Sequence, residues 1–152
     1  MESFKDLGAP AVEWGPLQIW VHGRAFPDSL DAWDGNWLRI TARCSEAGAS
    51  VTTSGVLLDA VSFFSWRSEL QKMYECLQGE AVLDSHEPIL RVAVTSRGQV
   101  GQITVRVEIS PNMEQGHWFE FAADQTFLPP IVEQCDALLE RFPVRRPAER
   151  GV

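Results

Sequence analysis

The chain has 152 residues and a mass of 17.0 kDa, a length that suits one domain with its own hydrophobic core. With 45% hydrophobic and 22% charged residues it has the composition of a folded soluble protein, and no apolar run approaches the ~18 residues of a membrane helix. The formal net charge of −8 and the pI near 4.8 disfavour nucleic acid and anionic membrane surfaces as partners and favour a basic protein.

The first half of the chain is predicted to hold three strands and a helix. Alternating apolar and polar residues predict the strands, at 17–22, 37–44 and about 50–58. The polar residues 23–36 form a loop between the first two. Apolar residues then recur every three or four positions, which predicts a helix over about 60–77 that Asp59 caps and Gly79 ends.

The second half is predicted to hold four strands and a second helix. The same alternation places the strands at about 81–84, 90–94, 103–109 and 118–123. The last helix is predicted to start near Thr126 as its N-cap and to run to about Arg141, with Pro129 and Pro130 in its first turn.

This order of elements predicts an α+β fold. Short links between successive strands indicate antiparallel pairing, because parallel strands need long crossovers. We therefore predict a twisted antiparallel sheet of about six to seven strands with two helices packed on one face. The single domain covers residues 17–142, between an N-terminal arm at 1–16 and an arginine-rich tail at 143–152.

The tail masks part of the acidity of the domain. Residues 141–152 contain four arginines and one glutamate, so the other 140 residues carry nine basic and 20 acidic side chains, a net of −11. The body of the domain is therefore more acidic than the whole chain.

Motifs for catalysis are missing from the sequence. There is no GxSxG turn, no glycine-rich phosphate loop and no HExxH or CxxC pair. The histidines and cysteines are scattered singly: His22, His86, His117, Cys44, Cys76 and Cys135. We therefore expect no enzymatic activity, no cofactor and no disulfide framework, and the lack of a signal-like apolar segment predicts a cytoplasmic location.

Asp28, Asp31 and Asp34 form the best candidate acidic cluster. Their spacing of three would bring the carboxylates together on a helical turn. Three interpretations stay open: a solvated loop in which they cap turns, an acidic patch for a partner, or a cation site that does not have the spacing of an EF-hand.

Trp20 and Trp37 lie opposite the aliphatic residues of their strands. The same face carries polar side chains, namely His22, Arg39, Thr41 and Arg43. This predicts a half-exposed aromatic and polar sheet surface that binds a protein. The alternative is that the arm or a loop covers the two tryptophans.

Three blocks resemble the WapI-like immunity proteins, a group of small bacterial cytoplasmic proteins. They are Trp33-Asp34-Gly35-Asn36-Trp37-Leu38, Tyr74-Glu75 through Gly79-Glu80-Ala81 to Glu87-Pro88, and Asp124-Gln125-Thr126-Phe127-Leu128-Pro129. The resemblance covers about residues 17–142. It implies that the chain binds and neutralises a toxin, because the founding member is the antitoxin of a repeat-containing toxin that ends in a nuclease domain.

Two classes of function follow from these observations. The first is a non-enzymatic protein that binds a toxin domain, such as a basic nuclease, through Trp20, Asp28, Asp31, Asp34 and Trp37. The alternative is a small enzyme or a ligand- or metal-binding protein with an acidic cleft near the three aspartates and Glu87. A homodimer joined through the Trp20 and Trp37 face is a further possibility.

Overall fold

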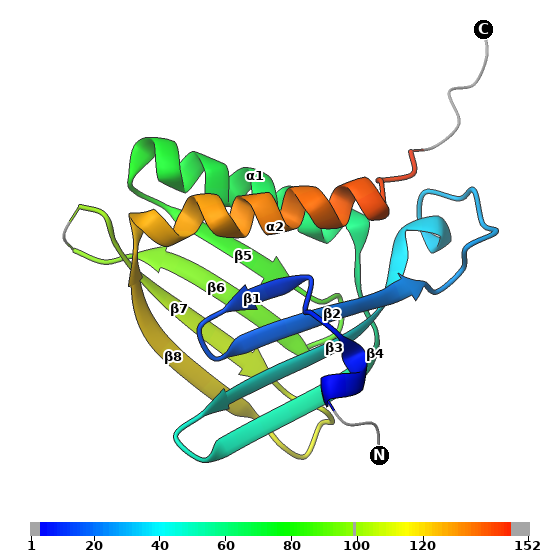
Figure 1. The fold of residues 1–152 in the computed structure, drawn as a ribbon, viewed down its shortest axis with the longest axis horizontal. Helices are drawn as coiled ribbons and strands as arrows, with labels where there is room; N and C mark the ends of the chain where they lie inside the picture. The colour runs from blue at the N-terminus through cyan, green and yellow to red at the C-terminus, as the bar shows by residue number, and fades with distance from the viewer. Residues whose placement is uncertain (1–3, 99, 147–152) are drawn as a thin grey trace, which may run out of the picture.

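The structure, a computed structural model, describes residues 4–98 and 100–146 and runs twice through four antiparallel strands and a helix (Figure 1). The first set is β1 (Val12–Trp14), β2 (Leu17–Arg24), β3 (Trp37–Glu46), β4 (Ala49–Asp59) and α1 (Ala60–Cys76). The second is β5 (Glu80–Asp84), β6 (Leu90–Ser96), β7 (Gln102–Ile109), β8 (His117–Asp124) and α2 (Leu128–Arg141). Single 3-10 turns are η1 (Phe4–Leu7), η2 (Asp34–Asn36) and η3 (Gln125–Phe127).

The α+β class, the antiparallel pairing and the two helices are confirmed. The strands divide into two sheets of four, β1-β2-β3-β4 and β5-β6-β7-β8, rather than one sheet of six to seven. The division falls at α1, which carries the chain away from β4 before β5 begins. One strand was not predicted. It is β1, which lies inside the predicted N-terminal arm and whose Val12 and Trp14 are buried.

One hydrophobic core joins both sheets and both helices. The sheets face each other with their apolar sides, so that Trp14 of β1 meets the ring of Phe121 of β8 edge-on at 6.2 Å. The helices lie side by side on the same side of the strands (Figure 1), and Arg67 of α1 reaches Asp136 of α2 at 2.8 Å. None of the helices among the described residues is long and apolar enough to cross a membrane.

Local chemistry explains where the elements turn and end. Ala47 and Gly48 have positive φ of 50° and 85°, which gives the tight turn between β3 and β4. The predicted cap of α1 is confirmed, because Asp59 Oδ1 accepts the Ser62 N–H at 2.7 Å. The predicted end at Gly79 is wrong: Leu77 takes the left-handed conformation and donates its N–H to the Met73 carbonyl at 2.7 Å.

The capping residue of the second helical segment lies two positions before the predicted one. Asp124, rather than Thr126, is the capping residue, and its carboxylate accepts the Thr126 N–H at 2.8 Å to begin η3. The prolines at 129 and 130 then lie in the first turn of α2, as predicted. The short 3-10 turn allows a carboxylate upstream to do the capping.

Candidate functional site

The loop between β2 and β3, residues 25–36 and here called the Trp33 loop, presents apolar side chains to solvent. Leu30 is 83% exposed and Trp33 is 70% exposed. The loop makes its own turn, in which the Gly35 N–H bonds to the Asp31 carbonyl at 2.8 Å and the Trp33 N–H bonds to Asp31 Oδ1 at 2.7 Å. Such large exposed side chains on an ordered loop are typical of a contact surface for another protein.

The three predicted aspartates lie on this loop and are all exposed. Asp31 shapes the turn, and Asp34 opens η2. They do not converge on a cation site, because the described residues contain no group of three or more His, Cys, Asp or Glu side chains that could hold a metal ion. The Asp31 carboxylate therefore caps a turn of the loop, and the exposed Asp31 and Asp34 flank Trp33 in the sequence.

Trp20 and Trp37 do not form the half-exposed pair that the strand alternation predicts. Trp20 is only 4% exposed, and its Nε1–H donates to the Gly8 carbonyl at 3.0 Å, so the segment before β1 lies over it. Trp37 is half-buried, with its ring edge-on to His86 at 5.1 Å. The alternative interpretation, in which the arm or a loop covers them, describes Trp20. The exposed tryptophan that the sequence analysis did not select is Trp33. It could have been found as a large aromatic residue in a Gly- and Asp-rich loop, where no strand alternation places it toward the core.

A hollow of about 420 Å³ adjoins the Trp33 loop. Ala32 and Trp33 line it on the loop side, and Val61 lines it from the exposed side of α1. The remaining wall is mostly polar and comes from the end of β4, α1, β5 and the loop that follows β5, namely Asp59, Ser62, Ser65, Val82, Asp84 and His86. An aromatic wall of this kind suits the stem and the charge of a long basic side chain.

Ser62, Asp59 and His86 bring hydrolase-type side chains together, but in the wrong order for catalysis. The Ser62 hydroxyl donates to Asp59 Oδ1 at 2.8 Å, and His86 Nε2 lies 3.3 Å from Asp59 Oδ2. The aspartate thus stands between the serine and the histidine, whereas an activated serine needs the histidine as its direct base. The contacts instead cap α1 and tie the loop after β5 to it.

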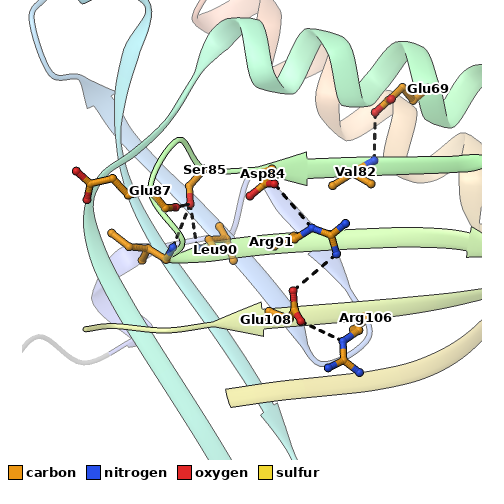
Figure 2. Close-up of polar contacts among 10 residues, drawn as sticks. Glu69, Val82, Asp84, Ser85, Glu87, Leu90, Arg91, Arg106 and Glu108 are labelled. Atoms are coloured by element: carbon orange, nitrogen blue, oxygen red, sulfur yellow. Dashed lines mark hydrogen bonds and ion pairs between the residues drawn. The ribbon is translucent and has the colours of Figure 1, made fainter. Parts of the chain in front are cut away.

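The loop between β5 and β6 is ordered by one buried hydroxyl, that of Ser85. Ser85 Oγ accepts the N–H groups of Leu90 at 3.0 Å and Ile89 at 3.3 Å and donates to the Glu87 carbonyl, as Figure 2 shows for Glu87 and Leu90. His86 is therefore held in place at the edge of the hollow. Glu87, the fourth acidic residue of the predicted cleft, is exposed and lines two neighbouring hollows rather than this one.

The cysteines offer no activated thiolate among the buried positions. Burial raises the pKa of the Cys44 thiol to about 11 and that of Cys135 to about 12. Cys76, at the end of α1, is exposed, and all three are free. Buried thiols of this kind pack as small apolar groups.

The outer face of the second sheet is a second exposed surface, and its charges are paired. Arg91 bridges Asp84 and Glu108 at 3.7 Å each, and Arg106 meets Glu108 at 3.2 Å (Figure 2). Trp118, 61% exposed, lies under the Arg106 guanidinium at 4.6 Å. Because these charges compensate each other, this face exerts little pull on a charged partner.

Comparison with known proteins supplies one finding. Residues 12–143 match the family model described as the Immunity protein WapI-like family. The resemblance expected from the three sequence blocks is thereby confirmed. No curated protein and no solved structure matches the chain.

Proposed function

This chain belongs to the WapI-like immunity protein family, and on that premise we propose that it neutralises a toxin by direct, non-enzymatic binding with the Trp33 loop at the centre of the contact. The observation that carries this proposal is the exposure of Trp33 and Leu30, 70% and 83%, on a loop with three exposed carboxylates. Aromatic anchors of this kind supply most of the binding energy in protein interfaces.

Charge favours a basic toxin domain, such as a nuclease. A body with a net charge of −11 attracts a surface that evolved to hold phosphates, and the three aspartates place part of that charge beside Trp33. The hollow of about 420 Å³ next to Trp33 then receives a lysine or arginine of the toxin against the indole. Occupying the nucleic-acid site of a nuclease would be enough to inhibit it.

The test is binding of the toxin domain encoded by the neighbouring reading frame, with association and dissociation rates measured by surface plasmon resonance. Trp33→Ala should raise the dissociation rate about 30-fold or more, which corresponds to an interface hot spot of about 2 kcal/mol. Because Trp33 is exposed, this variant should unfold at the same temperature as the wild type.

Two further variants separate charge from shape. Reversing Asp34 to lysine should slow association and weaken its dependence on salt, with a smaller effect on dissociation. Asp31 is left in place because its carboxylate accepts the Trp33 N–H. Trp118→Ala is the matched control, since it also removes a largely exposed tryptophan, from the other sheet, and should leave both rates unchanged. Absence of a complex, or a loss of binding on Trp118→Ala but not on Trp33→Ala, would refute the proposal.

A further inference from the structure

The chain after α2 is bound to the Trp33 loop by backbone and side-chain hydrogen bonds. Asn36 Nδ2 donates to the Arg145 carbonyl at 2.8 Å, and Asn36 Oδ1 accepts the Arg145 N–H at 2.7 Å. The Arg145 guanidinium donates to the Ser29 carbonyl. In Figure 1 the end of α2 lies beside this loop, although the two are more than 100 positions apart in sequence.

A second arginine, Arg24 of β2, bonds both to the Trp33 loop and to the chain after α2. Arg24, near the end of β2, donates through Nη1 to the Gly35 carbonyl at 2.6 Å and through Nη2 to the Pro143 carbonyl. Burial, and then the positive charge of Arg145, lower the pKa of Arg24. Two positive charges are therefore held close together. Their repulsion is offset by hydrogen bonds from the two guanidinium groups to carbonyls of the loop.

Packing at Gly35 and Asn36 shows how closely the parts fit. A Cβ added at Gly35 would lie 2.6 Å from the Ser29 carbonyl oxygen and 3.1 Å from Arg145 Cδ. Asn36 is only 1% exposed, and its amide also donates to the Ala32 carbonyl at 2.6 Å. The Gly-Asn pair in the first sequence block therefore serves the contact between loop and tail.

The arginines leave the acidic side chains of the loop available. Both guanidinium groups bind backbone carbonyls, and none of the ion pairs within the described part of the chain involves Asp28, Asp31 or Asp34. Without residues 143–146, the loop would keep its own turn at residues 31–35 and the bond from Arg24 of β2 to Gly35, but it would lose the bonds that connect Ser29 and Asn36 to Arg145. A loop that must be ordered on binding loses affinity to the entropy of ordering.

We propose that residues 143–146 form a clasp that holds the Trp33 loop in its partner-binding shape, so that Arg145 is a positioning residue that sets the dissociation rate of the toxin. The proposal rests on the function proposed above, because it takes the Trp33 loop as the contact surface. It assigns residues 143–146 a role in binding.

The test compares Arg145→Ala with Arg146→Ala in the full chain. Both remove one positive charge from adjacent positions, but only Arg145 bonds to the loop, while Arg146 is exposed. Hydrogen exchange without any partner is the first readout. The Ser29 amide, next to the carbonyl that Arg145 binds, should exchange about tenfold faster in Arg145→Ala, the loss expected for one charged hydrogen bond. The Trp33 and Gly35 amides, which belong to the loop's own turn, and the amides of β6 and β7 should not change.

The second readout is the dissociation rate of the toxin complex. Arg145→Ala should raise it about tenfold, whereas Arg146→Ala should leave it at the wild-type value. Unchanged exchange, or faster exchange with unchanged dissociation, overturns the clasp while leaving the proposed function intact. If Trp33→Ala also leaves dissociation unchanged, the proposed function fails and the clasp proposal falls with it.

Discussion

Asp59 is the residue at which β4 passes into α1, and its replacement by alanine should destabilise the whole domain. Its side chain is only 10% exposed. Oδ1 accepts the Ser62 N–H at 2.7 Å and the Ser62 hydroxyl at 2.8 Å, while Oδ2 lies 3.3 Å from His86 Nε2. Alanine removes all three contacts and leaves the first turn of α1 without a cap.

The expected loss can be worked from these contacts. Removing an N-cap costs about 1 kcal/mol. The Ser62 hydroxyl is half-buried and can turn toward water, so its lost bond adds about 0.5 to 1 kcal/mol. The free energy of unfolding should therefore fall by about 2 kcal/mol, which for a domain of this size lowers the melting temperature by roughly 4 to 8 °C.

Asp59→Asn is the matched control. Asparagine caps helices about as well as aspartate, so this variant should lose less than about 1 kcal/mol. Urea unfolding at pH 7, followed by circular dichroism and tryptophan fluorescence, measures both variants. The capping role of Asp59 is refuted if the free energy of unfolding of Asp59→Ala lies within about 0.5 kcal/mol of the wild-type value. It is also refuted if Asp59→Asn is as damaging as Asp59→Ala, because the negative charge and not the cap would then be responsible.

Two further predictions concern ionisable groups. Iodoacetamide at pH 8 should label Cys76 alone in the folded protein, because burial raises the pKa of Cys44 to about 11 and that of Cys135 to about 12. Mass spectrometry counts the labels, and a second label on the folded protein would contradict this prediction. Hydrogen bonds from the Thr126 hydroxyl and amide lower the pKa of Asp124 from its ordinary value of 3.8. The ionised Asp124 cap therefore stabilises the fold at any pH above 3.8, and this stabilisation is lost as the pH falls through the lowered pKa of the folded state. The stability difference between the wild type and Asp124→Ala should therefore be constant from pH 7 to 5 and shrink only in stronger acid, as urea titrations at each pH will show; a difference that already shrinks at pH 5 would contradict it.

Periodicity located the long strands and both helices. The alternation at 103–109 and the three-and-four spacing at 60–77 both correspond to observed elements, β7 and α1. β1 was missed because three residues are too few for an alternation to register, and its burial depends on Phe121 and on α2. The Gln134 side chain of α2 bonds to the Glu13 N–H at 2.8 Å, a contact across 121 positions.

The candidate site was partly visible in the sequence. The three aspartates marked the loop, and the first sequence block included Trp33. Alternation also put Trp20 on the correct outer face of its strand, but the Gly8 segment that covers it follows no periodic pattern. The neighbours of Trp33 in the hollow come from α1 and β5, so only the packed structure brings them together.

What the sequence determined by itself is local: the α+β order of elements, the cap at Asp59, the acidic loop and the family blocks. These depend on the few residues on either side of each position, where backbone geometry and side-chain period act directly. The tertiary structure alone decided that the strands form two sheets, that Trp20 is covered while Trp33 is exposed, and that Asn36 bonds to Arg145. Contacts between residues 109 positions apart depend on how the helices and sheets pack around one core, and no local pattern encodes that packing.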